Sequence, residues 1–222
     1  MGLAQIEVVW TDPPYGVSYI GGTSDALVIT NDNDGAPLLF RDALKTAWEQ
    51  LEPSCRLYAT VPPGPLNIEF RLAFRAAGFN FHESLVWVKD RMVLGHSDYH
   101  FKHEDMLYGW KPGTGRAGRG NHKGTRWYGD HSATSVFEIS RPQASKEHPT
   151  MKPVALVELC LRNSSQQGNA IYDPFLGSGT TLIACEKLDR ICYGMEIEPR
   201  YVDVCIRRWE TYTGKKAELL YG

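Results

Sequence analysis

The order of apolar and polar residues in the first third of the chain alternates between two periods. Residues 6–10 and 57–61 are apolar runs that stop at consecutive prolines, which predicts two short buried strands. Residues 40–51 and 66–77 instead place apolar side chains at i, i+4, i+7 and i+8, the stripe of an amphipathic helix. Gly78 stands where it can cap the second of these helices.

The middle of the chain changes character. Residues 80–88 and 104–110 are rich in aromatic side chains and predict two further strands. In residues 111–147, glycine, arginine, serine and threonine dominate and the periodicity fades. This stretch therefore predicts an insertion rather than a part of the core.

Regular patterns return in the last third. Residues 154–162 are apolar on nearly all sides and predict a buried helix. Residues 170–172 predict a strand that enters a glycine-rich turn and a helix through Lys187, and residues 191–195 predict the next strand. Pro199 suits the first turn of a final helix. Because strands alternate with helices, we expect an α/β fold with a mostly parallel sheet and helices on both faces.

The composition fits one globular domain that spans residues 1–222. Apolar residues make up 42% and charged residues 23% of the chain, which excludes a disordered or fibrous protein. No apolar run approaches the ~20 residues of a membrane span, and no basic-then-apolar leader opens the chain, so a cytoplasmic protein is expected. The five cysteines show no metal-binding spacing, which favours reduced thiols and no metal.

The net charge of −2 hides an uneven distribution. Residues 1–40 hold five acids and neither Lys nor Arg, whereas residues 106–128 hold five basic residues and no acid. Such a basic segment can neutralise phosphates, so the acidic total does not exclude a nucleic-acid partner. The basic residues of this segment are Lys111, Arg116, Arg119, Lys123 and Arg126.

The strand, glycine-rich turn and helix at residues 170–187 form one candidate site. Glycine lets a ligand approach the backbone closely, and a helix N-terminus offers unpaired N–H groups. Glu196 ends the next strand, where an acid typically binds ribose hydroxyls. Leu182 replaces the third glycine of a dinucleotide fingerprint, and no Gly-Lys-Ser/Thr of a P-loop follows. A nucleoside without a pyrophosphate fits this pattern better.

A second candidate site is Asp12-Pro13-Pro14-Tyr15, directly after a predicted strand. Its two prolines stiffen the turn and remove two N–H donors. A carboxylate, backbone carbonyls and an aromatic ring remain, which can accept hydrogen bonds and stack on a flat group. A nucleobase with an exocyclic amine needs both contacts, although a bare Pro-Pro-Tyr turn is also compatible with a purely structural role.

Together, the two sites resemble the motif pair of AdoMet-dependent DNA amino-methyltransferases. Asp12–Tyr15 matches their catalytic tetrapeptide, Asp173–Thr180 their cofactor motif, and residues 148–153 their His-Pro-Thr-x-Lys-Pro element. The catalytic motif comes first and the basic insertion lies between the two, which resembles the beta class, a circular arrangement of the seven-stranded Rossmann-like methyltransferase fold. The resemblance spans nearly the whole chain and is closest to phage and bacterial methylase domains of the kind sometimes fused to ParB-like domains.

The resemblance implies a role for each matched residue. Asp12 and the Pro13 carbonyl would accept the two amine hydrogens of a flipped-out base, Tyr15 would stack on the base, and Pro14 would stiffen the turn. S-adenosyl-L-methionine (AdoMet) would donate the methyl group without a metal, and Glu196 would bind its ribose. The other implied cofactor contacts are Thr150, Lys152, Asp173, Pro174, Phe175, Gly177, Ser178, Gly179 and Thr180.

The resemblance also implies partners. Residues 111–147 would be the target-recognition region, in which Trp127 joins the five basic residues on DNA, and residues 16–36 would close over the base. We expect a restriction–modification setting in the cytoplasm of a bacterium or phage-infected cell. A homodimer, or a fused or separate partner domain, remains open.

The acceptor base is the least determined feature. Asp before Pro-Pro-Tyr favours adenine N6 within this family, whereas Ser at that position often marks cytosine-N4 enzymes. Adenine N6 is therefore the leading hypothesis and cytosine N4 the alternative. A hypothesis of a different class is a non-catalytic module that holds DNA or AdoMet, against which the completeness of the motifs argues.

Overall fold

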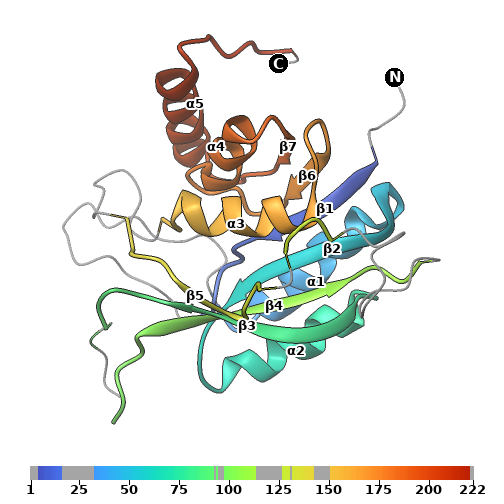
Figure 1. The fold of residues 1–222 in the computed structure, drawn as a ribbon, viewed down its shortest axis with the longest axis vertical. Helices are drawn as coiled ribbons and strands as arrows, with labels where there is room; N and C mark the ends of the chain where they lie inside the picture. The colour runs from blue at the N-terminus through green and yellow to red at the C-terminus, as the bar shows by residue number, and fades with distance from the viewer. Residues whose placement is uncertain are drawn as a thin grey trace.

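The computed structural model describes residues 5–16, 33–92, 94, 98–113, 127–130, 132–142 and 151–220. These residues form a seven-stranded sheet in the order β5-β3-β4-β2-β1-β6-β7, with helices on both faces (Figure 1). The strands are β1 (Ile6–Thr11), β2 (Leu51–Val61), β3 (Asn80–Val88), β4 (His103–Trp110), β5 (Val136–Glu138), β6 (Ala170–Asp173) and β7 (Ile191–Gly194). The helices are α1 (Ala36–Thr46), α2 (Leu66–Ala76), α3 (Val154–Ser164), α4 (Thr180–Lys187) and α5 (Pro199–Thr213).

Strand direction determines where the functional side chains gather. Strand β4 is antiparallel to both of its neighbours, β2 and β3, whereas the other four neighbouring pairs are parallel. In the described part of the chain, β4 alone therefore runs against the rest. The carboxyl ends of six strands and the amino end of β4 consequently meet at one edge of the sheet. The predicted α/β fold, with a mostly parallel sheet and helices on both faces, is confirmed.

Alternating side chains of β1 divide the core into two layers. Val9 faces α1 and α2 and packs with Phe40, whereas Val8 and Trp10 face α3 and α4 and pack with Leu156. All five side chains are at most 1% exposed. Full burial of a large apolar side chain contributes roughly 1.5–3 kcal/mol, so both layers hold the sheet between its helices.

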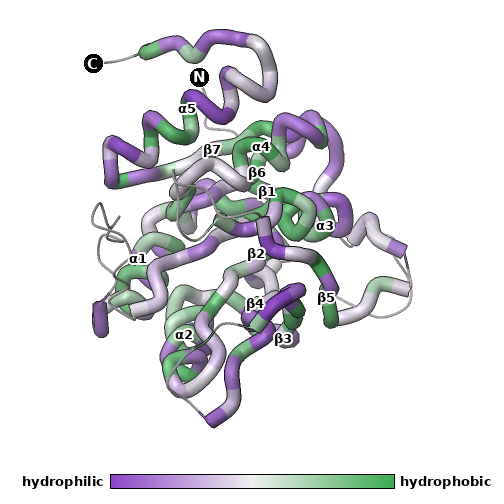
Figure 2. Tube along the Cα trace, turned by 90° about the vertical axis from the view of Figure 1, so that its left-hand side faces the viewer, coloured by the Kyte–Doolittle hydropathy of each residue, from purple (hydrophilic) through white to green (hydrophobic). Residues whose placement is uncertain are grey.

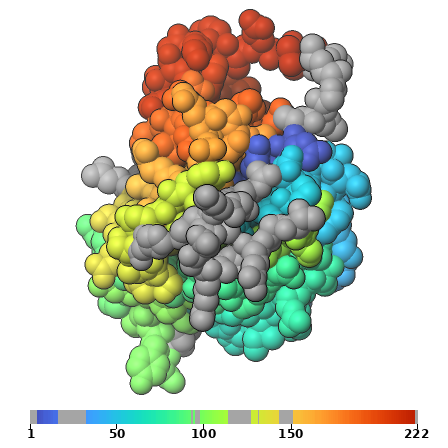
Figure 3. Space-filling view, turned by 45° about the vertical axis from the view of Figure 1, so that its right-hand side comes forward, coloured from blue at the N-terminus to red at the C-terminus, as the bar shows by residue number. Residues whose placement is uncertain are grey.

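Helix α5 lies at the periphery and covers α4. Hydrophilic and hydrophobic turns alternate along α5, whereas α3 and α4 are largely hydrophobic (Figure 2). Its buried side chains are Tyr201, Val204 and Cys205, which recur at helical spacing. The space-filling view shows these C-terminal elements, in orange and red, at one end of the molecule (Figure 3).

The bounds of α1 and β2 differ most from the sequence-based expectation. Helix α1 begins at Ala36, before the predicted start, because buried Ala36 and Pro37 occupy its first turn. It ends at Thr46, and the rest of the predicted stripe forms a 3₁₀ turn, Trp48–Gln50, followed by a β2 strand that already begins at Leu51. The expected cap at Gly78 is confirmed by its positive φ of 100°.

A further difference lies in the predicted insertion, where the structure has a strand. Val136–Glu138 pairs in parallel with Val86–Val88 of β3, so part of residues 111–147 adds an edge strand to the sheet. A three-residue strand is too short to show a periodicity, which explains why the sequence pattern missed it.

Three general expectations can be compared with the described residues. No helix among them is long and apolar enough to cross a membrane. No group of three or more His, Cys, Asp or Glu side chains in this part of the chain could hold a metal ion. None of the five cysteines, all of which lie in the described part of the chain, forms a disulfide bond.

Candidate active site

The two sequence motifs meet at the edge where the carboxyl ends of the parallel strands converge. Asp12 follows β1, Asp173 ends β6 and Glu196 lies two residues beyond β7. Thr60 stands near the end of β2, and Glu104 is the second residue of the oppositely directed β4. A crevice at the carboxyl ends of such strands is the usual ligand site of α/β folds.

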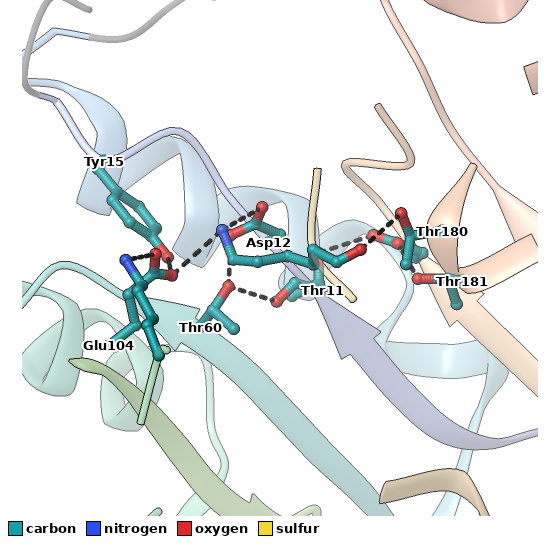
Figure 4. Close-up of polar contacts among 10 residues, drawn as sticks. Thr11, Asp12, Tyr15, Thr60, Glu104, Thr180 and Thr181 are labelled. Carbon is teal, nitrogen blue, oxygen red and sulfur yellow. Dashed lines mark hydrogen bonds and ion pairs between the residues drawn. The ribbon is translucent and has the colours of Figure 1, made fainter. Parts of the chain in front are cut away.

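Both oxygens of the Asp12 carboxylate accept a hydrogen bond (Figure 4). The Thr60 hydroxyl donates to Oδ1, and the Lys152 ammonium donates to Oδ2 at 2.8 Å. The Asp12 side chain is nevertheless 24% exposed. The carboxylate is thus held in one orientation while part of it stays accessible to a ligand.

Tyr15 lies beside Asp12 and is fixed at its hydroxyl. This hydroxyl donates to Glu104 Oε2 at 2.7 Å, and Lys152 Nζ lies 5.1 Å from the centre of the ring. Burial and the neighbouring carboxylates of Asp12 and Glu104 raise the pKa of Tyr15 well above its usual value. The phenol therefore remains a neutral hydrogen-bond donor.

Two lysines and two carboxylates form a buried cluster at this site. Glu104 Oε1 lies 2.6 Å from Lys89 Nζ, and Glu104 Oε2 lies 3.2 Å from Lys152 Nζ. Burial opposes the charged form of Glu104, but the ammonium groups of Lys152 and Lys89 outweigh it and lower the pKa to about 2. Burial likewise opposes the charged form of Lys152, but Asp12 and Glu104 raise its pKa. Both groups are therefore ionised at neutral pH.

Asp173 ties the glycine-rich turn to the first strand. Its carboxylate accepts the Thr11 hydroxyl at 2.9 Å, the Thr181 hydroxyl at 2.6 Å and the Phe175 N–H at 3.0 Å. Burial raises its pKa to about 7, against these three donors, which favour the charged form. Because Thr11 precedes Asp12, Asp173 fixes the position of the turn relative to Asp12.

Glu196 closes the glycine-rich turn from β7. Its two oxygens accept the N–H groups of Gly177 and Glu198, both at 2.8 Å. Gly179 adopts a positive φ of 81°, and a Cβ there would lie 2.8 Å from Cys205 Sγ, so only glycine fits. A carboxylate beside a tight backbone turn suits the ribose hydroxyls of a nucleoside.

Most of the expected cofactor residues are gathered at this turn. One segment that runs from β6 into α4 holds Asp173, Pro174, Phe175, Gly177, Ser178, Gly179 and Thr180. Glu196 binds this segment through the N–H of Gly177. Lys152 lies between the two motifs. Its backbone carbonyl accepts the Thr180 hydroxyl at 3.4 Å, whereas its ammonium points at Asp12. Thr150 lies outside the described residues.

Four contributors escaped the sequence pattern: Thr11, Thr60, Lys89 and Glu104. Lys89 and Glu104 stand at the facing ends of two aromatic strands, and charged residues at such positions are an available signal. Thr11 and Thr60 lie within apolar strands. Buried threonines in strands are commonly structural, so their role follows only from the contacts.

The expected DNA contacts are only partly described. The Lys111 ammonium donates to the carbonyls of Trp48 and Leu51 at 2.7 and 2.8 Å, so it is bound within the protein. Trp127 donates to the Asp130 carbonyl at 3.4 Å. Arg116, Arg119, Lys123 and Arg126, and residues 17–32 of the expected closing loop, lie outside the described residues.

The comparison with known sequences covers nearly the whole chain. A family model described as DNA methylase matches residues 6–207. The type II methyltransferase M.HpaI of Haemophilus parainfluenzae is 25% identical over 219 residues, which cover 93% of this chain and 68% of the relative. M.Cfr9I of Citrobacter freundii is 28% identical over 160 residues, and the match spans 66% of this chain and about half (51%) of that relative.

Solved structures share the fold. The putative DNA modification methylase TTHA0409 of Thermus thermophilus, in complex with S-adenosyl-L-methionine, superposes with a TM-score of 0.69 at 24% identity and covers 100% of this chain and 93% of its own. The cytosine-N4-specific PvuII DNA methyltransferase has a TM-score of 0.66 at 15% identity, with 92% and 79% covered. Since the family model spans both motifs and nearly the whole sheet, the chain belongs to the DNA methylase family of N6/N4 DNA methyltransferases.

Proposed function

We propose that this protein transfers a methyl group from AdoMet to the N6 amine of a flipped-out adenine in DNA. One observation carries the proposal: the oriented, partly exposed carboxylate of Asp12 lies beside the Tyr15 ring and is tied through Thr11 and Asp173 to the glycine-rich turn. An acceptor for an amine, a ring for stacking and a nucleoside turn thus share one edge of the sheet.

The residues of the turn fit AdoMet. Gly177 and Gly179 adopt positive φ values of 52° and 81° that shape a tight turn, and the Glu196 carboxylate beside it would bind the ribose hydroxyls. Asp173 and Phe175 line the same segment. When bound, AdoMet supplies an electrophilic methyl group on a sulfonium centre.

The chain's own groups act on the amine. An exocyclic amine is a weak nucleophile because its lone pair is delocalised into the ring. Accepting its two hydrogens at Asp12 and at the Pro13 carbonyl localises that lone pair on nitrogen. The methylated nitrogen then releases a proton, and the Asp12 carboxylate, already hydrogen-bonded to that nitrogen, would accept it. Positioning two reactants in the correct geometry can lower an activation barrier by about 7–11 kcal/mol, so we attribute much of the rate enhancement to orientation.

The base must leave the duplex to reach Asp12. Extrusion costs about a few kcal/mol, and stacking on Tyr15 offsets part of this cost. The proposed DNA contacts are Trp127 and the basic residues Arg116, Arg119, Lys123 and Arg126 of the 106–128 segment, without Lys111, whose ammonium is bound within the protein. Tyr128 binds the Asn163 carbonyl near the far end of α3, 11 residues from Lys152. Asn163 lies nine residues, or about 14 Å, along α3 from its first residue Val154, so Trp127 is near the opposite end of this helix from Lys152 and within the span of one DNA site.

The aspartate of the tetrapeptide supports adenine, whereas the PvuII enzyme, a structural neighbour, acts on cytosine N4. The test is incubation of the protein with methyl-labelled AdoMet and unmethylated DNA, followed by nucleoside analysis. We expect label in N6-methyladenine. Label only in N4-methylcytosine overturns the adenine assignment and establishes the alternative. AdoMet binding without transfer to any duplex or single strand establishes a non-catalytic module.

Asp12→Ala separates the two sites. It removes the amine acceptor but leaves the glycine-rich turn, so transfer is lost while AdoMet affinity, measured by calorimetry, stays within a few-fold. Asp42→Ala, which removes an exposed carboxylate of α1, is the matched control and keeps full activity. Loss of AdoMet binding in Asp12→Ala contradicts the role assigned to Asp12.

A further inference from the structure

Glu104 belongs to neither sequence motif, yet it contacts three residues of the site. Its Oε2 accepts the Tyr15 hydroxyl at 2.7 Å and lies 3.2 Å from Lys152 Nζ. Its Oε1 lies 2.6 Å from Lys89 Nζ. The Glu104 side chain is only 12% exposed. Three donors on two oxygens therefore hold a single buried carboxylate (Figure 4).

The sheet itself places Glu104. In the antiparallel ladder of β3 and β4, Glu104 pairs with Trp87, and two residues further along the Lys89 N–H donates to the Lys102 carbonyl. Because β4 runs against β2, its first residues lie at the edge where Asp12 emerges. A side chain on a rigid strand is located more closely than one on a loop.

Glu104 also balances charge at the site. The cluster holds two ammonium groups and two carboxylates, and Glu104 contacts both Lys89 and Lys152. Without Glu104, Lys89 would lose the carboxylate of its described ion pair, and Lys152 would keep one of its two carboxylates, Asp12. Since buried unpaired charges are costly, the lysines would rearrange, and the Lys152 ammonium would no longer be held from two sides.

We propose that Glu104 is a positioning residue that fixes the Tyr15 ring and the Lys152 ammonium around Asp12 before a base enters. This inference rests on the proposed methyl transfer. The Tyr15 ring provides the stacking face for the base, and Lys152 orients Asp12, the amine acceptor. The Glu104 carboxylate therefore positions both groups that would contact the base. Glu104 does not serve as the proton acceptor, because its neighbouring ammonium groups keep its pKa near 2.

Two substitutions separate the contacts of Glu104. Glu104→Gln removes the charge but keeps an oxygen for the Tyr15 hydroxyl, whereas Glu104→Met removes both. We expect kcat for methyl transfer to fall about 10-fold in Glu104→Gln and about 100-fold in Glu104→Met. The affinity for AdoMet should stay unchanged. In the wild-type background, Tyr15→Phe should lower kcat. In the Glu104→Met background it should lower kcat no further, because the hydrogen bond of the Tyr15 hydroxyl is already absent there.

A pH profile distinguishes positioning from mere stability. In Glu104→Gln, Lys152 keeps its burial but loses one of two carboxylates, so its pKa falls. The alkaline limb of the kcat profile should therefore move to lower pH, and it should not move in Tyr15→Phe. Lys89→Met is the matched control, because it disrupts the same cluster without touching Tyr15 or Lys152. It should lower kcat by less than either Glu104 variant.

Each outcome bears on the proposal. A Glu104→Met enzyme with wild-type kcat and pH profile overturns it, as does a Lys89→Met enzyme that loses as much kcat as Glu104→Met. If the wild type transfers no methyl group to any DNA, the proposed function fails separately. The ¹⁵N resonance of the Lys152 ammonium then decides the positioning role: titration at lower pH in Glu104→Gln supports it, and an unchanged titration overturns it.

Discussion

The Lys152 ammonium donates to Oδ2 of Asp12 at 2.8 Å, although the two residues lie 140 positions apart in the chain. The resemblance to methyltransferases implies that Lys152 holds the methionine end of AdoMet. Its carbonyl does contact Thr180 at the start of α4, but its charge is directed at the amine acceptor. Lys152 therefore connects the cofactor turn with the base pocket.

Lys152→Met tests this placement. The substitution leaves Glu104 with the Lys89 ammonium and Asp12 with the Thr60 hydroxyl, and loss of one partner of a buried ion pair costs about 3–5 kcal/mol. We expect a lower free energy of unfolding and loss of methyl transfer, with AdoMet affinity within a few-fold of the wild type. Denaturant titration and calorimetry measure the two quantities. Lys187→Met, at a more exposed pair with Glu158, is the control and should change neither. A selective loss of AdoMet affinity would instead support a role at the methionine end.

Gly179→Ala tests the geometry of the cofactor turn. The new Cβ would lie 2.8 Å from Cys205 Sγ in a backbone with a φ of 81°. We expect a loss of about 1–3 kcal/mol in stability and weaker AdoMet binding. Gly168→Ala is the matched control, since Gly168 has a φ of 80° with no atom within 4 Å of the added Cβ. It should show the conformational cost alone and leave AdoMet affinity unchanged. Equal effects on AdoMet at both glycines would show that the contact with Cys205 is unimportant.

Asp173 gives the stability a defined pH dependence. Burial raises its pKa in the folded state to about 7, from an ordinary value of 3.8. The folded protein thus retains this proton at a pH where the unfolded chain has lost it. The stabilisation is complete below the unfolded pKa and is lost as the pH rises through about 7.

We therefore expect the free energy of unfolding to fall between about pH 4 and pH 7 by up to a few kcal/mol, at no more than about 1.4 kcal/mol per pH unit, and to level off above that range. Asp173→Asn should remove most of this slope. Asp42→Asn should keep it, because the Arg41 guanidinium lowers the pKa of Asp42 and moves its titration out of that range. Urea titrations at several pH values measure the slope, and equal slopes in the wild type and Asp173→Asn would refute the assignment.

The basic segment predicts that the affinity for DNA depends on the salt concentration. Each phosphate contact contributes about 0.9 to the slope of log K against log salt, so alanine at Arg116, Arg119 and Lys123 should reduce this slope by roughly 3. AdoMet affinity should not change. Fluorescence anisotropy at several salt concentrations measures the effect. A triple alanine variant elsewhere, at Lys45, Lys187 and Lys216, is the charge-matched control. An equal reduction there would show that DNA contact is not confined to the basic segment.

The amino-acid sequence by itself determined the strands and helices of the core, the order of the two motifs and the family. Apolar periodicity is local, and a glycine-rich turn after a strand has the same appearance in sequence and in structure. The convergence of Asp12 with Asp173 was not among the predictions; it results from the parallel pairing of β1 with β6, which brings their carboxyl ends to one edge.

Only the tertiary structure decided which groups surround Asp12. Glu104 joins this site because β4 runs against the other strands, a reversal that residues 104–110 do not reveal, and it pairs there with Lys89 at the carboxyl end of β3. Tertiary contacts also removed Lys111 from the free charges of the basic segment, since its ammonium binds the carbonyls of Trp48 and Leu51. A side chain's type can be seen in the sequence, but its direction and partners depend on strand register and on the packing of distant residues.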